Sequence, residues 1–501
     1  MEKVTLNLNL NEIRKVDPRL MSYNVEMTEV TGGTFWKAYT KGQVEGTEEF
    51  PALGSLANMG KIMQVYPPIN LYNEKLRYLA NQFGSVWVRV SGTWATKTYY
   101  DIEGKTNGVV PQGYQSILTK EQWYGVLDFV KAINAKLLIS VNNCEGLHKA
   151  CEPWHPTQAE LLFKTAKEYG VPVEAAEFMN EPNMLAFSGA PVGYTGKDYV
   201  RDQDLFIKWV RENYPETLLV GPCTVAMENS SDGEIDTGNA GGIVSMMGDN
   251  CTTDQLMDGA TQKFDVYSYH YYNGISDRLA SVMPQMHWSP ERTLSEDYLN
   301  VAPASCRLST KPRDRYVPNG QMWVTESGDA GGGGNSWAST FMDVFRTLNE
   351  LGTFATITDG IIFHNTLASS AYGFLEHGTF DPRPNYFAVL LWTRLMGETV
   401  YDSNEVIREG AHVFAHSRKD GKEGKAYLVI NNSKTESTEV DLPKEAEVYV
   451  LSAEYVRSET MLLNGRPLVL NEDNTLPDLS GQKVEKGILT LAPATCTFIV
   501  L

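Results

Sequence analysis

Two glutamates lie where catalytic carboxylates would be expected. The apolar run at residues 322–325 ends at Glu326, and a glycine-rich stretch follows almost at once. A second apolar run, at 173–179, leads through Asn180 to Glu181. Two carboxylates at the carboxyl ends of two strands can act as a general acid and as a nucleophile, the pair of groups that cleaves a glycosidic bond. The remaining sequence must explain how two residues so far apart in the chain meet.

Eight runs of strand-forming residues recur between residues 16 and 400. They lie at 21–27, 86–90, 137–141, 173–179, 218–220, 264–269, 322–325 and 361–364. Between several of them apolar residues recur at helical spacing, as in 123–133, 161–169 and 341–348. This alternation predicts an α/β chain with a (β/α)₈ TIM barrel. Because the strands of such a barrel end on one face, Glu181 after the fourth strand and Glu326 on the seventh are expected to converge.

The two ends of the chain have a different pattern. After about residue 400, short strand-like runs alternate with turn residues, which predicts a C-terminal antiparallel β-sandwich at 401–501. Residues 1–15 alternate apolar and polar side chains and are expected to add a strand to it. The catalytic barrel then spans 16–400. Segments 227–262 and 286–320 are polar and are expected to be large loops on the active face.

The composition and net charge restrict which classes of binding partner are expected. The 501 residues carry a net charge of −19, which disfavours binding to nucleic acid or to an anionic membrane. No basic leader and no long apolar window is visible, so we expect a soluble, cytoplasmic protein unless a signal peptide was removed. The six scattered cysteines favour free thiols, although Cys144 and Cys151 could pair. The sequence leaves the oligomeric state open.

Motifs spread over the whole chain resemble glycoside hydrolase family 79, the heparanase and β-glucuronidase family of retaining glycosidases. They are NEPN at 180–183, SYHYYNG at 268–274, WVTES at 323–327 with the glycine run behind it, AYGFL at 371–375, FDPRPNY at 380–386, LLNG at 462–465 and TLP at 475–477. The last two lie in the C-terminal part, which few members of the wider clan would share.

The resemblance implies a role for each residue of the reaction centre. Glu181 would be the acid/base and Glu326 the nucleophile of a double displacement. Asn180 would reach the sugar 2-hydroxyl, and Tyr272 would hold and polarise Glu326. For His270, on the same strand end as Tyr272, a structural and a catalytic role are equally compatible with the sequence.

The resemblance also implies a site for a uronate carboxylate. The amides of Gly332 and Gly333 and the side chain of Tyr372 would contact it, and glycine frees backbone N–H groups to converge on an anion. Glu26 stands where the family has an aspartate that contacts the sugar ring. Asp329 departs from the family pattern and places an acid near this site, although most loop aspartates point outward.

Other chemistries find little support. The glycine run lacks the ending of a phosphate loop, and neither a zinc-binding helix motif nor a serine nucleophile motif is present. The expected chemistry needs no metal and no organic cofactor.

Several functions fit the carboxylate pair. The preferred one is an exo-acting β-glucuronidase for terminal, unsulfated β-D-glucuronides, since the few basic stretches are short and interrupted by acids. The alternatives are an endo-acting enzyme of the heparanase type, a neutral-sugar β-glycosidase and a carbohydrate-binding protein with little turnover.

Overall fold

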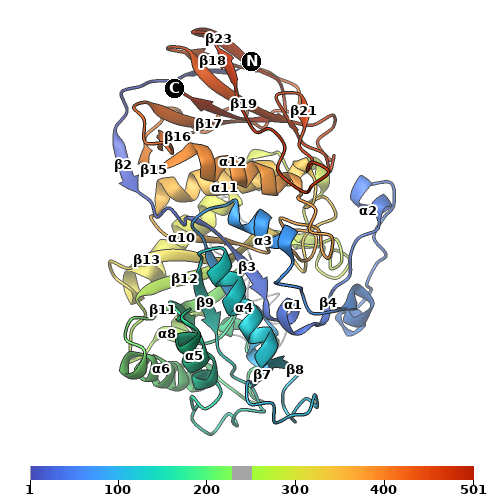
Figure 1. Cartoon of the computed structure of the whole chain (residues 1–501), viewed down its shortest axis with the longest axis vertical. Coiled ribbons are helices and arrows are strands. Elements are labelled where there is room, and N and C mark those ends of the chain that lie inside the picture. Colours follow the sequence, from blue (N-terminus) through green and yellow to red (C-terminus); the bar gives the residue numbers. More distant parts are fainter. Residues whose placement is uncertain (1, 228–250) are drawn as a thin grey trace.

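A computed structural model describes residues 2–227 and 251–501 of the chain. Eight strands within them pair in parallel and close into a barrel, in the spatial order β10-β11-β12-β13-β14-β3-β6-β9 (Figure 1). In chain order they are β3 (Met21–Glu26), β6 (Trp87–Ser91), β9 (Lys136–Ser140), β10 (Ala175–Glu177), β11 (Leu218–Met227), β12 (Val266–Ile275), β13 (Gln321–Gly331) and β14 (Ile362–His364). Each of the eight predicted runs overlaps one of these strands, so the predicted barrel is confirmed.

Helices connect most of the strands and cover the barrel. In α4 (Lys120–Ala132) the hydroxyl of Thr119 accepts a hydrogen bond from the Gln122 N–H, and the Gln122 side chain accepts one from the Thr119 N–H. This reciprocal cap fixes the start of the helix, and its apolar face is buried against the barrel. The other helices of the barrel part are α3 (Glu74–Asn81), α5 (Ala159–Tyr169), α6 (Gly196–Asn213), α8 (Thr253–Met257), α9 (Glu296–Leu299), α10 (Val301–Tyr316), α11 (Val344–Ile357) and α12 (Pro384–Leu395).

The interior of the barrel changes from apolar to polar along its axis. At the amino ends of the strands, Trp87 and Trp323 pack with their ring centroids 5.2 Å apart, inside an apolar cluster that contains residues from every barrel strand except β3. Side chains of a strand alternate between its faces, so the residue two positions after Trp87, Arg89, points into the same interior. Near the carboxyl ends of the strands the interior is therefore polar.

One of the two predicted loops is wrong in part. Within segment 286–320 the chain forms α9 and the 16-residue helix α10, with only short connections around them. Two prolines, Pro303 and Pro312, hid this helix. Pro303 lies in the first turn, where a missing N–H leaves no bond unmade, and the buried face from Val301 to Ser309 holds the helix against its neighbours. Of the other predicted loop, 227–262, Met227 ends β11, α8 occupies part of the remainder, and 228–250 lie outside the described residues.

A long excursion follows β3 and contributes to the mouth of the barrel. It consists of α1 (Met27–Thr31), β4 (Gly33–Trp36), α2 (Lys41–Glu45), the 3₁₀ helix η1 (Leu56–Ile62) and β5 (Met63–Tyr66). Phe35 and Trp36 of β4 share an apolar cluster with Ile275, Leu279 and Met283, which follow β12. A second excursion after β6 forms the pair β7 (Thr98–Asp101) and β8 (Ser116–Thr119).

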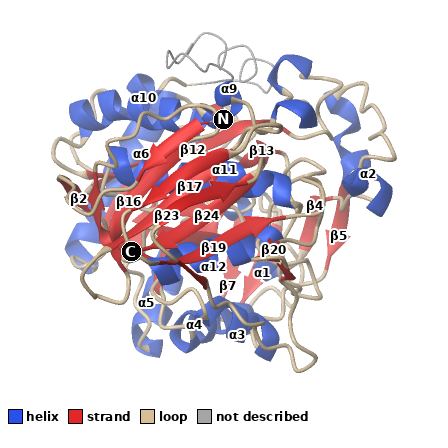
Figure 2. Ribbon diagram, turned by 90° about the horizontal axis from the view of Figure 1, so that it is seen from above, coloured by secondary structure: helices blue, strands red, loops and turns tan. Residues whose placement is uncertain are grey.

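The C-terminal part consists of antiparallel strands with contributions from the N-terminus. A nine-stranded sheet has the order β2-β15-β16-β17-β24-β19-β20-β21, with β22 paired to β19, and the neighbours β16, β17, β24 and β19 are labelled in Figure 2. A three-stranded sheet has the order β1-β18-β23, and apolar residues of both sheets form one shared core. The strands are β1 (Glu2–Thr5), β2 (Glu12–Lys15), β15 (Met396–Tyr401), β16 (His412–Arg418), β17 (Lys425–Asn431), β18 (Thr438–Leu442), β19 (Ala446–Ser452), β20 (Leu462–Leu463), β21 (Arg466–Pro467), β22 (Gln482–Val484), β23 (Gly487–Leu491) and β24 (Thr495–Val500).

Helices α11 and α12 lie between the barrel and the large sheet (Figure 1). Helix α12 contacts β15 and β24, and α11 contacts β15, β16 and β17, so the two parts share an apolar boundary. None of the described helices is both long enough and apolar enough to span a bilayer.

Candidate active site

A β-bulge in β13 sets the position of Glu326. Tyr269 of β12 pairs with Val324, but the next residue, His270, pairs with Glu326, so Thr325 is an extra residue. A bulge redirects the side chains that follow it. The Glu326 side chain consequently lies beside His270 in the interior of the barrel.

Glu181 is held in an unusual backbone conformation. Its φ of 45° and ψ of 56° fall in the left-handed region, which residues with a side chain rarely adopt. Pro182 begins the 3₁₀ helix η3 (Pro182–Met184) directly after it, and the Ser188 hydroxyl donates to the Glu181 carbonyl at 2.7 Å. Backbone strain of this kind persists where the surrounding structure enforces it, commonly at functional sites.

His270 lies between the two glutamates. Its Nδ1 is 3.0 Å from Glu181 Oε1 and 3.6 Å from Glu326 Oε2, and its Nε2 is 3.4 Å from Arg89 Nη2. Since a guanidinium only donates, Nε2 faces a donor, and Nδ1 is the ring nitrogen that can donate toward the glutamates. Nδ1 can then donate to Glu181 Oε1, which leaves the other carboxyl oxygen, Oε2, to hold an acidic proton.

Arg89 is a residue of this site that the sequence analysis missed. Fully buried, it donates from Nη1 to Glu326 Oε1 at 2.9 Å, from Nη2 to Asn180 Oδ1 at 2.8 Å, and from Nε to Glu177 Oε2 at 2.9 Å. The signal that could have found it is a lone charged residue inside the apolar strand run at 86–90, since a buried charge requires a partner.

The two glutamates have opposite electrostatic environments. Burial raises the pKa of Glu181, the charge of Glu326 raises it further, and the hydrogen bond from His270 opposes them. Burial also acts to raise the pKa of Glu326, but His270, Arg89 and the Tyr272 hydroxyl together lower it below its usual value. One carboxyl therefore keeps its proton more readily while the other ionises more readily, which is the division needed between an acid and a nucleophile.

The same residues form a possible cation site. One ligand atom each from Glu181, His270 and Glu326 lie within 4.8 Å of one another. However, the Arg89 guanidinium already bonds Glu326 and abuts the His270 ring. Its positive charge disfavours a divalent cation at this place.

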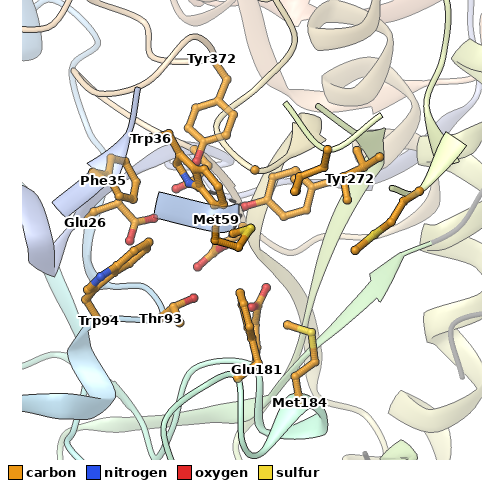
Figure 3. Close-up of a pocket in the computed structure, with 18 of the residues that line it drawn as sticks. Glu26, Phe35, Trp36, Met59, Thr93, Trp94, Glu181, Met184, Tyr272 and Tyr372 are labelled. Carbon is orange, nitrogen blue, oxygen red and sulfur yellow. Dashed lines mark hydrogen bonds between the residues drawn. The ribbon is translucent and has the colours of Figure 1, made fainter. Parts of the chain in front are cut away.

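Tyr272 and Tyr372 share one amide partner. The Tyr272 hydroxyl donates to Glu326 Oε2 at 2.7 Å, as the family resemblance implied for a residue that holds Glu326. Asn365 Nδ2 donates to both hydroxyls, at 3.0 Å to Tyr272 and 3.1 Å to Tyr372, and Asn24 in turn donates to Asn365 Oδ1. The Tyr372 hydroxyl proton remains available to a ligand, and both hydroxyls point toward the same region of the cavity in Figure 3.

Two N–H groups of the glycine run, those of Gly332 and Gly333, have no acceptor among the described residues, whereas the Gly334 N–H donates to the Ala330 carbonyl. Gly332, Gly333 and Gly334 have φ values of 88°, 86° and 77°, and a Cβ atom at Gly333 would lie 2.7 Å from Trp36 Cβ. The carbonyls of all three accept hydrogen bonds, whereas none of the described hydrogen bonds uses the N–H of Gly332 or Gly333. Of these two predicted residues, Gly332 lines the cavity and Gly333 does not.

Arg278 supports the glycine run from behind. Its side chain is buried, donates from Nη1 to the carbonyls of Gly332 (3.1 Å) and Gly334 (2.8 Å), and donates from Nε and Nη2 to the Lys37 carbonyl. Its guanidinium stacks 3.8 Å from the centroid of the Tyr39 ring. No ion pair joins it to a carboxylate in the described part of the chain, so its charge faces carbonyl dipoles and the Tyr39 ring instead. Its position after β12 in a polar loop gave no sequence signal.

Glu26 lies on the cavity wall at the end of β3. It begins α1, where its side chain accepts from the Glu29 N–H and its own N–H donates to Glu29 Oε2 at 2.7 Å. Gly92 makes room for it, because a Cβ there would lie 1.6 Å from Glu26 Oε2. Burial raises the pKa of Glu26 well above its usual value, as do the charges of Glu326 and Glu29. A protonated Glu26 would present a hydrogen-bond donor to a ligand.

Asn180 is oriented by Arg89, which bonds its carbonyl oxygen. Its Nδ2 is buried and has no hydrogen-bond partner among the described residues. That donor is the atom available to a hydroxyl group of a ligand.

Asp329 does not point outward, and that expectation was wrong. The side chain is fully buried behind the glycine run, where Oδ2 accepts from the Asn335 N–H at 2.8 Å. Burial, together with the charge of Asp343, raises its pKa to about 8. An acid that is neutral around pH 7 exerts little repulsion on a bound carboxylate. Cys144 and Cys151 both carry free thiols.

A cavity of about 320 Å³ brings these groups together (Figure 3). Glu26, Glu181, Glu326, Tyr272 and Tyr372 all line it, and the wider lining is mostly aromatic and aliphatic. His270 and Asn180 are not among the lining residues, but His270 contacts Glu181, and both His270 and Asn180 contact Arg89.

The known proteins to which this chain is similar include heparanase-like proteins and glucuronidases. The chain is 24% identical to heparanase-like protein 1 of Arabidopsis thaliana over 84% of this chain and 82% of that one. It is 29% identical to the baicalin-β-D-glucuronidase of Scutellaria baicalensis over 48% and 46% of the two chains. The solved structure of a 4-O-α-L-rhamnosyl-β-D-glucuronidase from Fusarium oxysporum aligns over 99% of this chain and 100% of that one, with a TM-score of 0.62 and 12% identity, which supports the fold.

No family model matches the sequence. The similarity to named relatives nevertheless runs through both the barrel and the C-terminal sheets. With the motifs at 180–183 and 323–327 at the ends of the fourth and seventh barrel strands, the chain is a glycoside hydrolase that is similar to the heparanase and β-glucuronidase family, family 79.

Proposed function

We propose that this enzyme is a retaining exo-β-glucuronidase that removes a terminal β-D-glucuronosyl group. The observation that carries the proposal is a single cavity lined by Glu181, Glu326 and Gly332, and Gly332 is the first of two consecutive glycines whose N–H groups have no acceptor among the described residues. The Glu181–Glu326 pair can cleave a glycosidic bond, and the glycine N–H groups can bind a carboxylate. The names of the relatives, which include glucuronidases, support the same assignment.

In the first step Glu181 is the acid and Glu326 the nucleophile. Glu326 attacks the anomeric carbon while Glu181 passes the proton from Oε2 to the glycosidic oxygen, so the aglycone leaves as a neutral alcohol. The nearest oxygens of the two carboxyl groups lie within 4.8 Å, which leaves no room for the water that an inverting enzyme holds there. Arg89 and Tyr272 each bind a different oxygen of Glu326 and keep it ionised and oriented.

In the second step a water molecule hydrolyses the glycosyl-enzyme. Once Glu326 is esterified, its negative charge disappears, and with it one of the causes that raise the pKa of Glu181. Glu181 is then a better base for the attacking water. The Nδ2 of Asn180 is the free donor proposed to contact the sugar 2-hydroxyl, where hydrogen bonds strengthen in the transition state.

The glycine run is proposed to hold the uronate carboxylate. The N–H groups of Gly332 and Gly333 and the hydroxyl of Tyr372 supply donors, and Arg278 adds a fixed positive charge behind them. A neutral sugar would leave these donors unpaired and Arg278 uncompensated, which argues against a neutral-sugar β-glycosidase.

A heparan-cleaving enzyme is disfavoured by the charge of the cavity. The charged side chains in the described lining are Glu26, Glu181 and Glu326, with no lysine or arginine among them. A sulfated chain would need basic groups on both sides of the cleaved bond. A binding protein without turnover is disfavoured because both glutamates are present in complementary environments.

We also propose the corresponding division of the chain. The barrel, 16–400, carries the reaction, and the two C-terminal sheets, joined by residues 1–15, form a β-sandwich domain at 401–501 that supports the barrel through α11 and α12.

The proposal is tested with three substrates of different charge. We expect hydrolysis of an aryl β-D-glucuronide, at least about tenfold lower kcat/KM on the matching aryl β-D-glucoside, and at least about tenfold lower activity on heparan sulfate oligosaccharides, each a difference of about 1.4 kcal/mol in transition-state binding. Equal rates on glucoside and glucuronide would contradict the uronate site. Efficient heparan cleavage that falls steeply with salt would contradict exo action on unsulfated substrates.

A further inference from the structure

The proposed reaction does not explain one wall of the cavity. Beside the polar groups, the lining includes Phe35, Trp36, Leu56, Met59, Trp94 and Phe187. They come from three separate excursions, after β3, after β6 and after β10. Figure 3 shows Phe35, Trp36, Met59 and Trp94 gathered around one part of the cavity.

Phe35 and Trp36 are buried, but the other four side chains of this wall are incompletely buried. Leu56, Met59, Trp94 and Phe187 keep an intermediate exposure although each contacts the apolar cluster beside the cavity. Apolar surface left accessible around a concave site is favourable to cover, and its area contributes to the affinity of an apolar ligand. Phe35 and Trp94 meet edge to face with centroids 5.0 Å apart, which fixes two aromatic surfaces at this wall.

The chemistry of the wall argues against a sugar as its occupant. A sugar stacks on aromatic faces, but its hydroxyls need hydrogen-bond partners, and Leu56, Met59 and Phe187 offer none. An anionic group would meet the carboxylates of the cavity without any basic side chain in the described lining. An uncharged, flat, apolar group loses neither hydrogen bonds nor favourable charge interactions here.

We propose that this wall is the aglycone subsite, and that the natural substrate is the β-glucuronide of an uncharged aromatic alcohol. The inference rests on the proposed function for the place of the sugar and adds the class of its leaving group. Met59 lies on η1, whose outer residues Ala57 and Lys61 are exposed. Its flexible thioether can adapt to rings of different shape.

The test compares leaving groups of similar acidity, so that chemistry does not mask binding. The substrates are 2-phenylethyl β-D-glucuronide, ethyl β-D-glucuronide and an unsulfated disaccharide with a terminal β-glucuronosyl group. We expect kcat/KM to be at least tenfold higher for the phenylethyl compound than for either of the others, mainly through a lower KM. In Met59→Gln and in Leu56→Gln this preference should fall at least threefold. Ala57→Gln, on the same 3₁₀ helix but outside the cavity lining, should keep it.

A second readout does not depend on turnover. Titration with 2-naphthol should quench tryptophan fluorescence saturably, with weaker binding in Met59→Gln and unchanged binding in Ala57→Gln. If the phenylethyl and ethyl glucuronides are hydrolysed equally well, or the disaccharide best, the subsite is refuted while the glucuronidase assignment stands. If no glucuronide is hydrolysed but 2-naphthol binds as described, the apolar subsite stands and the proposed function fails. If 2-naphthol does not bind, the subsite is refuted.

Discussion

Arg89 Nη1 donates a hydrogen bond to Glu326 Oε1 at 2.9 Å, with both side chains buried inside the barrel. The same guanidinium also bonds Glu177 and Asn180. One residue of the second barrel strand thus connects the proposed nucleophile on the seventh strand with the residues that lead to the proposed acid after the fourth.

Replacement of Arg89 should change the pH dependence of the reaction. Arg89 is among the groups that lower the pKa of Glu326, and Glu326 must be ionised to attack. Activity is lost as the pH falls through that lowered pKa, so in Arg89→Met the acid limb of the kcat/KM profile should move upward, by about one pH unit or more. Arg89→Lys keeps a positive charge, so the acid limb of its profile should lie between those of the unaltered enzyme and of Arg89→Met. An unchanged acid limb in a folded Arg89→Met enzyme would contradict this role.

Arg89→Met should also be less stable. It leaves Glu177 and Glu326 buried without their cation, and breaking a buried ion pair costs about 3 to 5 kcal/mol of unfolding free energy. Denaturant unfolding of the two variants would measure this loss separately from activity.

The two glutamates should differ in their response to the leaving group. Glu326→Gln should abolish turnover on every glucuronide, because no nucleophile remains. Glu181→Ala should retain glycosylation only with leaving groups so acidic that they need no proton, such as 2,4-dinitrophenol. Pre-steady-state release of the phenol measures this step. Equal losses for acidic and weakly acidic leaving groups would overturn the assignment.

Arg278 should determine the preference for a uronate. In Arg278→Met the charge behind the glycine run disappears, so the ratio of kcat/KM for aryl glucuronide over aryl glucoside should fall about tenfold, or about 1.4 kcal/mol. Arg457→Met is a matched control, because Arg457 also donates to backbone carbonyls, those of Gln43 and Val44, but not to the glycine run. If the two variants lower the ratio equally, Arg278 has only a structural role.

Asp329 should make the fold less stable at high pH. Its pKa is about 8 in the folded chain against 3.8 as an ordinary aspartate, so the folded state holds a proton that the unfolded state releases. The stability contributed by the protonated form is complete below about pH 4 and is lost as the pH rises toward 8. Asp329→Asn has no proton to lose.

The difference in melting temperature between Asp329→Asn and the unaltered enzyme should therefore grow in favour of the variant from pH 4 to pH 8.5, by at least about 2 °C. Asp314, whose side chain is 67% exposed, provides the control Asp314→Asn, which should show no such trend. A difference that stays constant with pH would contradict a buried, protonated Asp329.

The sequence by itself determined the features that depend on short stretches. Strand-forming runs, helical periodicity and the change of pattern near residue 400 predicted the barrel and the antiparallel strands after it. Glu181 and Glu326 were recognisable because each follows its own apolar run, and all parallel strands of a barrel end on one face. In segment 286–320, prolines and charged residues concealed α10, whose stability comes from the packing of its buried face rather than from local preference.

The tertiary structure alone decided which polar groups share the interior. Arg89 finds its partners across the closed barrel, and Arg278 and Asn365 find theirs on segments far away in the sequence. A sequence pattern cannot show which distant carbonyl, carboxylate or hydroxyl group a polar side chain will contact. The inward position of Asp329 likewise follows from burial, since desolvation that keeps it protonated exists only after folding. The bulge at Thr325, the strained backbone of Glu181 and the apolar wall from three excursions are set by long-range pairing and packing, which the local sequence does not encode.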